Sequence, residues 1–260
     1  MNKIAVIILT GMFCARSLPA APPPGYQLAW AEEFDGPALN TNLWSYETGP
    51  RKSAINTPDA VCVSNGCLTI STSTRNGFHF TGMITTRHRF AEVHGYWESR
   101  IQFSDQPGEW SAFWLQGPAN NGKILDDTAK SGTEIDICEH RCRDIHGSNI
   151  INRVQHTLHW NGYGKYHKSV EHLSPDMNLA SGFHTYGCEV TAQGYKFFID
   201  DRLTWTTNVA ATDVPEFVLL SSEVSTNRWA GKIPAVGYED KSSGSTRVAF
   251  DYVRYYQPVK

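Results

Sequence analysis

The stretch GTEIDICEH, from Gly132 to His140 near the middle of the chain, decides the fold. Its three carboxylates, Glu134, Asp136 and Glu139, are interleaved with apolar residues in a pattern typical of a β-strand. Because side chains alternate along a strand, Glu134 and Asp136 point to one face, whereas Glu139 is out of register with them. One extra residue at Ile137 or Cys138, a β-bulge, would return Glu139 to the face of the other two.

Three like charges on one strand face cost repulsion and desolvation, so the pattern indicates a function. Cleavage of a glycosidic bond needs two carboxylates, and in a retaining glycosidase the two groups lie roughly 5–5.5 Å apart. Asp136, between the two glutamates, can hydrogen-bond the nucleophile and raise the pKa of a neighbouring acid. From the pattern alone, an acidic face that binds calcium or is simply solvated is the alternative.

Short segments rich in aromatic and β-branched residues recur along the chain, with Gly, Pro and Asn between them. Regular short strands separated by turns predict an all-β fold, an antiparallel sandwich or jelly roll. No internal repeat or break in composition marks a second domain. The predicted strands cover residues 67–72, 96–103, 111–115, 155–160, 184–190, 195–199, 217–220 and 247–256.

Composition bounds the possible partners. The 260 residues suffice for one large domain, and a net charge of −3 gives no support for a nucleic-acid partner. Aromatic residues make up 12% of the chain, with eight Trp. They could line a groove for an uncharged polar ligand, or they could be core.

Residues 1–20 have the features of an export signal, with Lys3 before an apolar run and a small-residue cleavage site at its end. The apolar run is shorter than the about 20 residues that span a bilayer, and no later segment could cross a membrane. A lipid anchor on Cys14 is the rival interpretation. Residues 21–25 form a Pro-rich spacer, and 26–260 form the predicted domain. We therefore expect a secreted or periplasmic protein.

Of the six cysteines, five follow the export signal, so an odd count leaves a free thiol or an intermolecular bond. Cys62 and Cys67 flank a turn at Ser64-Asn65-Gly66, and a four-residue hairpin loop would place them opposite each other. That arrangement is compatible with a disulfide. The spacings lack the paired C-x-x-C of a four-cysteine zinc site.

The motif from Glu134 to Glu139 resembles the bulged E-x-D-x-x-E signature of glycoside hydrolase family 16. The resemblance extends over the mature chain and implies a concanavalin-like β-jelly-roll sandwich of two antiparallel sheets with a concave substrate cleft. Similar stretches are residues 30–36 (WAEEFDG), 82–86 (GMITT), 95–100 (GYWESR), 108–115 (GEWSAFWL) and 250–257 (FDYVRYYQ).

The resemblance also implies roles for individual residues. Glu134 becomes the nucleophile, Asp136 the assisting acid, and Glu139 the general acid/base. Trp110 and Trp114 are expected to stack on sugar rings, although Trp114 could equally be core. The remaining substrate-binding candidates are His159, which in this family contacts sugar near the cleavage point, and Trp160.

No metal or other cofactor is required by the carboxylate mechanism. The spacing of His140, His146, His156 and His159 does not define a metal site. Many family members carry a structural calcium ion, and Glu33 and Asp251 stand at positions comparable to its carboxylate ligands.

We therefore expect a secreted, monomeric endo-β-glycosidase that acts on a polysaccharide with retention of configuration. The sequence favours a β-1,3-glucan as substrate, with a red-algal galactan of the agarose or porphyran kind as the runner-up. A transglycosylase is the close enzymatic alternative, because it passes through the same intermediate. A jelly roll that binds glycan without cleaving it is the alternative from another class.

Overall fold

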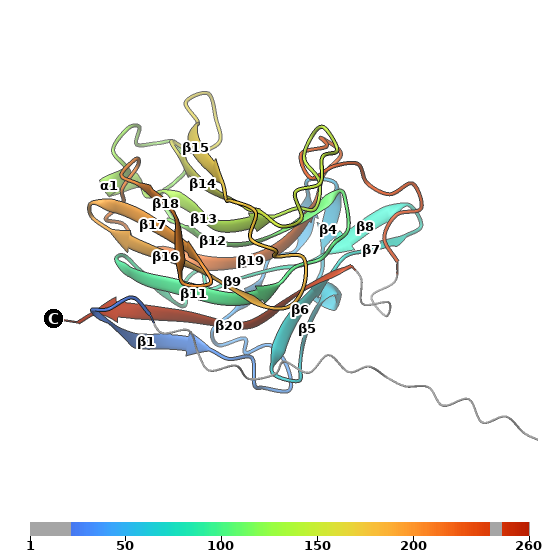
Figure 1. The fold of residues 1–260 in the computed structure, drawn as a ribbon, viewed down its shortest axis with the longest axis horizontal. Helices are drawn as coiled ribbons and strands as arrows, with labels where there is room; N and C mark the ends of the chain where they lie inside the picture. The colour runs from blue at the N-terminus through green and yellow to red at the C-terminus, as the bar shows by residue number, and fades with distance from the viewer. Residues whose placement is uncertain (1–21, 240–245, 260) are drawn as a thin grey trace, which may run out of the picture.

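Two large antiparallel sheets pack face to face in a computed structural model of the chain, which describes residues 22–239 and 246–259 (Figure 1). Each sheet has eight strands. The prediction of an all-β sandwich is therefore confirmed. The predicted export signal lies outside the described residues.

The sheet that carries the carboxylates has the strand order β15-β14-β13-β12-β19-β9-β2, with β10 paired to β19. Its central strands come from sequence that alternates apolar and polar residues. Its members are β2 (Ser45–Tyr46), β9 (Met83–Thr85), β10 (Ala91–Glu92), β12 (Glu109–Gln116), β13 (Glu134–His140), β14 (Val154–Trp160), β15 (Lys168–Leu173) and β19 (Glu216–Val224).

The opposite sheet has the order β18-β17-β16-β11-β20-β6-β5, with β1 paired to β20. The first and last strands of the domain therefore lie side by side at one edge of the molecule (Figure 1). Its members are β1 (Tyr26–Glu32), β5 (Val61–Ser64), β6 (Cys67–Ser71), β11 (Gly95–Gln102), β16 (His184–Thr191), β17 (Gly194–Ile199), β18 (Arg202–Thr207) and β20 (Arg247–Pro258).

A third, four-stranded sheet lies beside the sandwich and includes the one parallel pair of the described strands, β4 with β8. Its strands are β3 (Gly49–Arg51), β4 (Ala54–Asn56), β7 (Ser73–Arg75) and β8 (Phe78–Thr81). Helical structure is limited to η1 (Pro58–Ala60) and α1 (Thr128–Ser131). Within the described residues, no helix has the length and apolar character needed to cross a membrane.

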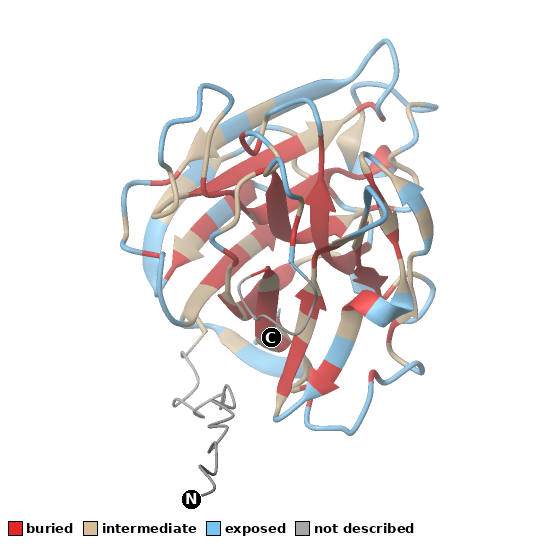
Figure 2. Ribbon diagram, turned by 90° about the vertical axis from the view of Figure 1, so that its right-hand side faces the viewer, coloured by how far each residue is buried: buried red, intermediate tan, exposed pale blue. Residues whose placement is uncertain are grey.

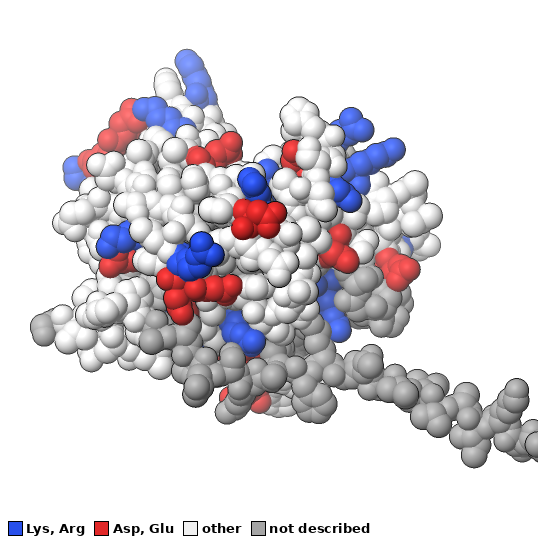
Figure 3. All heavy atoms as spheres, viewed as in Figure 1, with Lys and Arg blue, Asp and Glu red and all other residues white. Residues whose placement is uncertain are grey.

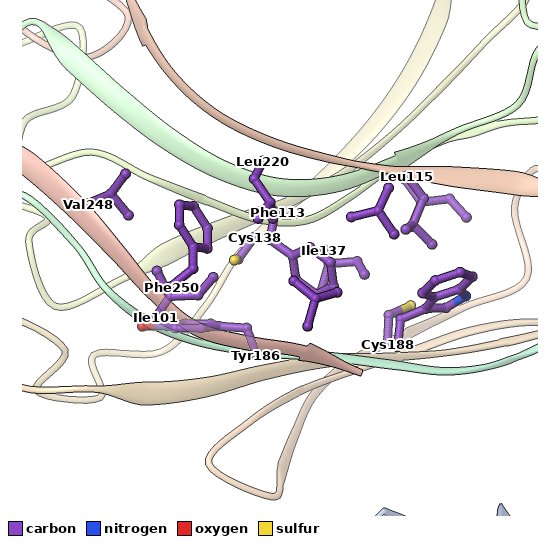
Figure 4. Close-up of a cluster of buried hydrophobic side chains, with 14 of the residues drawn as sticks. Ile101, Phe113, Leu115, Ile137, Cys138, Tyr186, Cys188, Leu220, Val248 and Phe250 are labelled. Carbon is purple, nitrogen blue, oxygen red and sulfur yellow. The ribbon is translucent and has the colours of Figure 1, made fainter. Parts of the chain in front are cut away.

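The core fills the space between the two large sheets (Figure 4). Buried positions run along the strands, whereas exposed positions gather in the connecting loops (Figure 2). From the carboxylate-bearing sheet, the core receives Phe113, Leu115, Ile137, Cys138 and Leu220, and from the opposite sheet Ile101, Tyr186, Cys188, Val248 and Phe250.

Strand β13 contains the predicted bulge. Along β12, Phe113 pairs with Cys138 but Trp114 pairs with Asp136, so Ile137 is the extra residue on that side. The pairing of β13 with β14 shifts over the same two residues. Both Ile137 and Cys138 are completely buried in the core. Two consecutive side chains thus point inward, which returns Glu139 to the outer face of the sheet.

The disulfide between Cys62 and Cys67 that a hairpin would allow does not form, because Cys62 is an exposed free thiol. Strands β5 and β6 are joined by a two-residue turn in which Asn65 and Gly66 both have positive φ. This tight turn pairs Cys62 with Thr69 and not with Cys67. The loop is shorter than the four residues expected, and the register differs accordingly.

A substitution at Gly187 on β16 would test how tightly the side chains of the opposite sheet are packed. A Cβ built there would lie 2.1 Å from the Tyr96 hydroxyl oxygen, and Tyr96 is itself buried. We expect Gly187→Ala to lower the free energy of unfolding by about 1–3 kcal/mol through overpacking. The matched control is Gly164→Ala, where nothing lies within 4 Å. Thermal and urea denaturation should show a difference between the two variants, and equal stabilities would contradict the packing described here.

Candidate active site

A groove crosses the outer face of the carboxylate-bearing sheet and consists of two adjoining pockets, of about 300 and 250 Å³. The space-filling view shows a notch between two raised flanks along the upper edge of the molecule (Figure 3). It also shows positive and negative side chains intermixed over this side. The two pockets share Arg51, Trp114, Glu134 and Tyr163, so they meet at Glu134.

All three predicted catalytic carboxylates line the larger pocket. Glu134 and Asp136 are each only 5% exposed, and Glu139 is half-buried. The bulge at Ile137 brings Glu139 to this side, while Ile135 between the first two carboxylates is buried in the core. Strand β13 is therefore acidic toward the groove and apolar toward the core.

Glu134 is held by two hydrogen-bond donors. Gln116 Nε2 donates to Oε2 at 2.6 Å, and the Tyr163 hydroxyl donates to Oε1. Burial raises the pKa of Glu134, whereas the hydrogen bond from Tyr163 and the charge of His159 act in the opposite direction. The two donors stabilise the anionic form of this carboxylate and fix its orientation.

Asp136 is paired with His159 on the neighbouring strand. His159 Nε2 lies 3.3 Å from Asp136 Oδ2, and its Nδ1 lies 2.9 Å from His167 Nε2. Burial and the nearby charge of Glu134 raise the pKa of Asp136 well above its usual range. His159, predicted as a substrate-binding residue, lies in the pocket and contacts the carboxylate cluster.

Glu139 has a different environment. Its Oε2 accepts a single hydrogen bond, from Thr157 Oγ1 at 3.2 Å. Burial raises the pKa of Glu139 well above its usual range, and the charge of Asp136 raises it further. The raised pKa favours a protonated Glu139 near neutral pH, which is the state that a proton donor requires.

Aromatic side chains line one part of the pocket. Trp110 and Trp114 both line the pocket, and Trp114 is also part of a small buried cluster. Trp114 Nε1 donates to Ser221 Oγ at 3.1 Å. Trp229, which the sequence did not single out, packs edge-on against Trp110 with ring centroids 5.2 Å apart. Trp160 does not line the pocket, because it follows His159 on β14 and so lies on the opposite face of the sheet.

The structure adds pocket residues that the sequence analysis missed. Tyr163 lies in the segment NGYG, which reads as a turn, and an aromatic residue in such a turn is the only available signal. Arg51 enters from β3, and its guanidinium pairs with Glu223 Oε1 at 2.9 Å. Gln116 and Arg51 carried no local signal, since distant strands bring them to the groove.

The two carboxylates proposed for calcium do not fit that role in this structure. Glu33 accepts hydrogen bonds from Arg254 Nε and Nη2 at 2.8 and 2.9 Å. Asp251 pairs with Arg100 Nη1 at 2.6 Å. Because calcium needs six to eight oxygen ligands, carboxylates already held by guanidinium groups are poor candidates.

Residues 27–258 match the family described as beta-porphyranase A-D, GH16 domain. The chain therefore belongs to glycoside hydrolase family 16. It is 28% identical over 236 residues to the endo-1,3-1,4-beta-glycanase ExsH of Rhizobium meliloti, which covers 87% of this chain and 46% of that protein. The chain thus spans a little under half the length of this curated relative.

Solved structures show the same fold. Porphyranase B from Zobellia galactanivorans superposes with a TM-score of 0.75 at 20% identity, covering 95% of this chain and 98% of that one. Laminarinase from Flavobacterium sp. UMI-01 superposes with a TM-score of 0.68 at 24% identity, covering 89% of this chain and 100% of that one.

Removing Ile137 would convert β13 into a regular strand in which all three carboxylates alternate onto the groove face. We expect the deletion variant to keep measurable glycanase activity, because Glu139 still faces the groove. The loss of a completely buried side chain should lower the free energy of unfolding by about 2–5 kcal/mol.

The matched control for this deletion is Ile137→Ala, which retains the bulge and loses most of the same side chain. Reducing-end assays and thermal melts of both variants are the measurements. If the deletion variant is folded but inactive while Ile137→Ala is active, the bulge itself is required for catalysis.

Proposed function

We propose that the protein is an endo-acting β-glycosidase that hydrolyses a polysaccharide by a double displacement. The observation that carries the proposal is the unequal environment of two carboxylates in one groove. Glu134 accepts two hydrogen bonds and suits an anionic nucleophile. Glu139 accepts only one and has a raised pKa, which suits a proton donor.

In the first step, a Glu134 oxygen attacks the anomeric carbon and forms an ester with the sugar. The bond from that carbon to the bridging oxygen breaks, and Glu139 gives its proton to the departing oxygen. In the second step, Glu139 takes a proton from water, and the water oxygen displaces Glu134 from the anomeric carbon. Tyr163 must yield its hydrogen bond to Glu134 when the sugar approaches.

Asp136 supports this cycle through its charge and through His159. Its pairing with His159 holds the imidazole against the carboxylate cluster. The raised pKa of Asp136 means that its charge is present only in its ionised form, and in that form it favours the protonated state of Glu139 before the first step. Asp136, which stands between the two glutamates on β13, therefore acts on the general acid Glu139.

For the substrate, we propose a β-linked galactan of the porphyran kind. The family match over residues 27–258 and the superposition on porphyranase B over nearly both whole chains support it. The larger pocket contains five carboxylates and two cations, so the sugar at the cleavage point is proposed to be uncharged. These charged residues are Glu134, Asp136, Glu139, Glu171, Glu223, Arg51 and Lys52.

A β-glucan is the second candidate, and it was favoured by the sequence. The similarity to ExsH and to the glucan endo-1,3-beta-glucosidase A1 of Niallia circulans supports it. Export from the cell, proposed from residues 1–20, would give the enzyme access to either polymer. Transglycosylation is possible through the same intermediate and is distinguished by product length.

A substrate panel tests the reaction and the polymer together. The purified protein is incubated with porphyran, agarose, carrageenan, laminarin and lichenan, and reducing ends are measured. We expect reducing ends to be released from porphyran, and we expect NMR of the products to show retention of configuration. Glu139→Gln should lower the rate by about 10²- to 10⁴-fold through loss of acid catalysis, and Glu134→Gln should reduce it to background.

The control is Glu92→Gln, an exposed carboxylate on β10 away from the pocket, which should leave the rate unchanged. Activity that survives Glu134→Gln would remove the nucleophile assignment. Tight binding of one glycan without any cleavage would favour a non-catalytic glycan-binding protein. Products longer than the donor would reveal transglycosylation.

Asp136→Asn tests the electrostatic coupling of the cluster. Because Asp136 raises the pKa of Glu139, a neutral amide at position 136 should lower that pKa. The protonated acid would then be lost at a lower pH, so the alkaline limb of kcat/KM should move to lower pH. An unchanged limb, measured on the same substrate, would mean that Asp136 carries no charge in the working enzyme.

A further inference from the structure

A hydrogen-bond network of buried polar side chains lies beneath Glu139. Arg141 Nη1 donates to Gln155 Oε1 at 3.0 Å. Gln155 Nε2 donates to Thr157 Oγ1 at 3.3 Å and to Glu171 Oε2 at 2.8 Å. Thr157 Oγ1 in turn contacts Glu139 Oε2 at 3.2 Å. Arg141, Gln155 and Thr157 are 8%, 6% and 2% exposed. The bonds that join these three residues are therefore buried, whereas the bonds to Glu139 and Glu171 are partly buried.

Arg141 determines the direction of every hydrogen bond in this network. A guanidinium has only donors, so the group of Gln155 that faces Arg141 must be the carbonyl oxygen. The amide nitrogen of Gln155 therefore faces Thr157 and Glu171. Glu171, as a carboxylate, needs a donor at that position and requires the same orientation independently.

Thr157 then has no choice of direction. Its oxygen accepts a hydrogen from Gln155, and its single hydroxyl hydrogen is left for Glu139 Oε2. That carboxylate oxygen is an acceptor and cannot also carry the acid proton toward Thr157. The other oxygen, Oε1, has no hydrogen-bond partner among residues 22–239 and 246–259, and Glu139 lines the pocket.

We propose that Arg141, Gln155 and Thr157 are positioning residues that keep the transferable proton of Glu139 on Oε1. The proposal rests on the assignment of Glu139 as the general acid/base. A carboxylic acid can carry its proton on either oxygen, and only one of them can face the departing sugar oxygen. The hydrogen-bond network of these three residues selects that oxygen before the substrate binds, so the acid group needs no reorientation at the moment of proton transfer.

Arg141 is suited to anchor the hydrogen-bond network because its own position is fixed by packing. Its guanidinium carbon lies 3.8 Å from the ring centroid of Trp229. Among the described residues, Arg141 makes no ion pair within 4.0 Å, so no carboxylate competes with Gln155 for its donors. A buried guanidinium without a carboxylate partner is costly, and the role in positioning Glu139 accounts for its presence.

Thr157 also affects the acidity of Glu139. A hydrogen bond donated to a carboxylate stabilises its charged form, so removal of the hydroxyl should raise the pKa of Glu139. The other ionisable groups that act on Glu139 remain in place in such a variant. They are Asp136 on its own strand, Arg141 beyond the end of that strand, His159 on β14 and Glu223 on β19.

The test compares Thr157→Val, which keeps the side-chain shape, with Thr157→Ser, which keeps the hydroxyl. On the cleaved polysaccharide, Thr157→Val should lower kcat by about 10-fold or more and move the alkaline limb of kcat/KM to higher pH. Thr157→Ser should restore both. On an aryl glycoside with a good leaving group, which needs no proton, kcat of Thr157→Val should fall much less.

Gln155→Met serves as a second variant, because it removes the donor to Thr157 without touching Glu139. It should lower kcat and move the alkaline limb in the same direction as Thr157→Val. Thermal melts of all variants establish that they are folded. An unchanged pH profile in folded Thr157→Val, or a failure of Thr157→Ser to restore it, would overturn the proposal.

Measuring Glu139→Gln on the same two substrates distinguishes failure of the positioning role from failure of the general-acid assignment of Glu139. If Glu139 is the acid, Glu139→Gln loses far more activity on the polysaccharide than on the aryl glycoside. Equal losses on both would remove the acid assignment itself. The selective loss in Glu139→Gln, with no effect in Thr157→Val, would remove only the positioning role.

Discussion

Strand β13 has the apolar core on one face and the groove on the other, and the rest of the site depends on how its side chains are divided between them. Toward the core it buries Ile135, Ile137 and Cys138, and toward the groove it presents carboxylates. Strict alternation could not deliver both with this sequence. The bulge solves the conflict by sending two consecutive residues inward, and the dense packing of the core then fixes its position.

Once the carboxylates share one face, their neighbours differentiate them. Gln116 and Tyr163 donate to Glu134, whereas Glu139 receives a single bond through β14. Charges so close together cannot all be present at little cost, and burial makes the anion of each less favourable. A site of this kind divides its protons unequally, and the unequal division is what the chemistry uses.

The sequence predicted the β-sandwich, the bulge and the shared face of the carboxylates, because each depends on local alternation. It missed strands β15 and β18, whose polar residues resemble loops until an adjacent strand supplies the pairing. It also placed Trp160 in the groove, although strict alternation after His159 excludes it. Tyr163, Arg51 and the residues that orient Glu139 depend on tertiary contacts that no local pattern encodes.

The exposed thiol of Cys62 gives this molecule a chemical handle. It is the one exposed free cysteine of the described residues, and it lies on β5 of the sheet opposite the groove. A maleimide attached there would sit on the far side of the sandwich from Glu134 and Glu139. Enzyme coupled to a solid support through this position would therefore hold its groove toward the solution, where a long polymer could enter it.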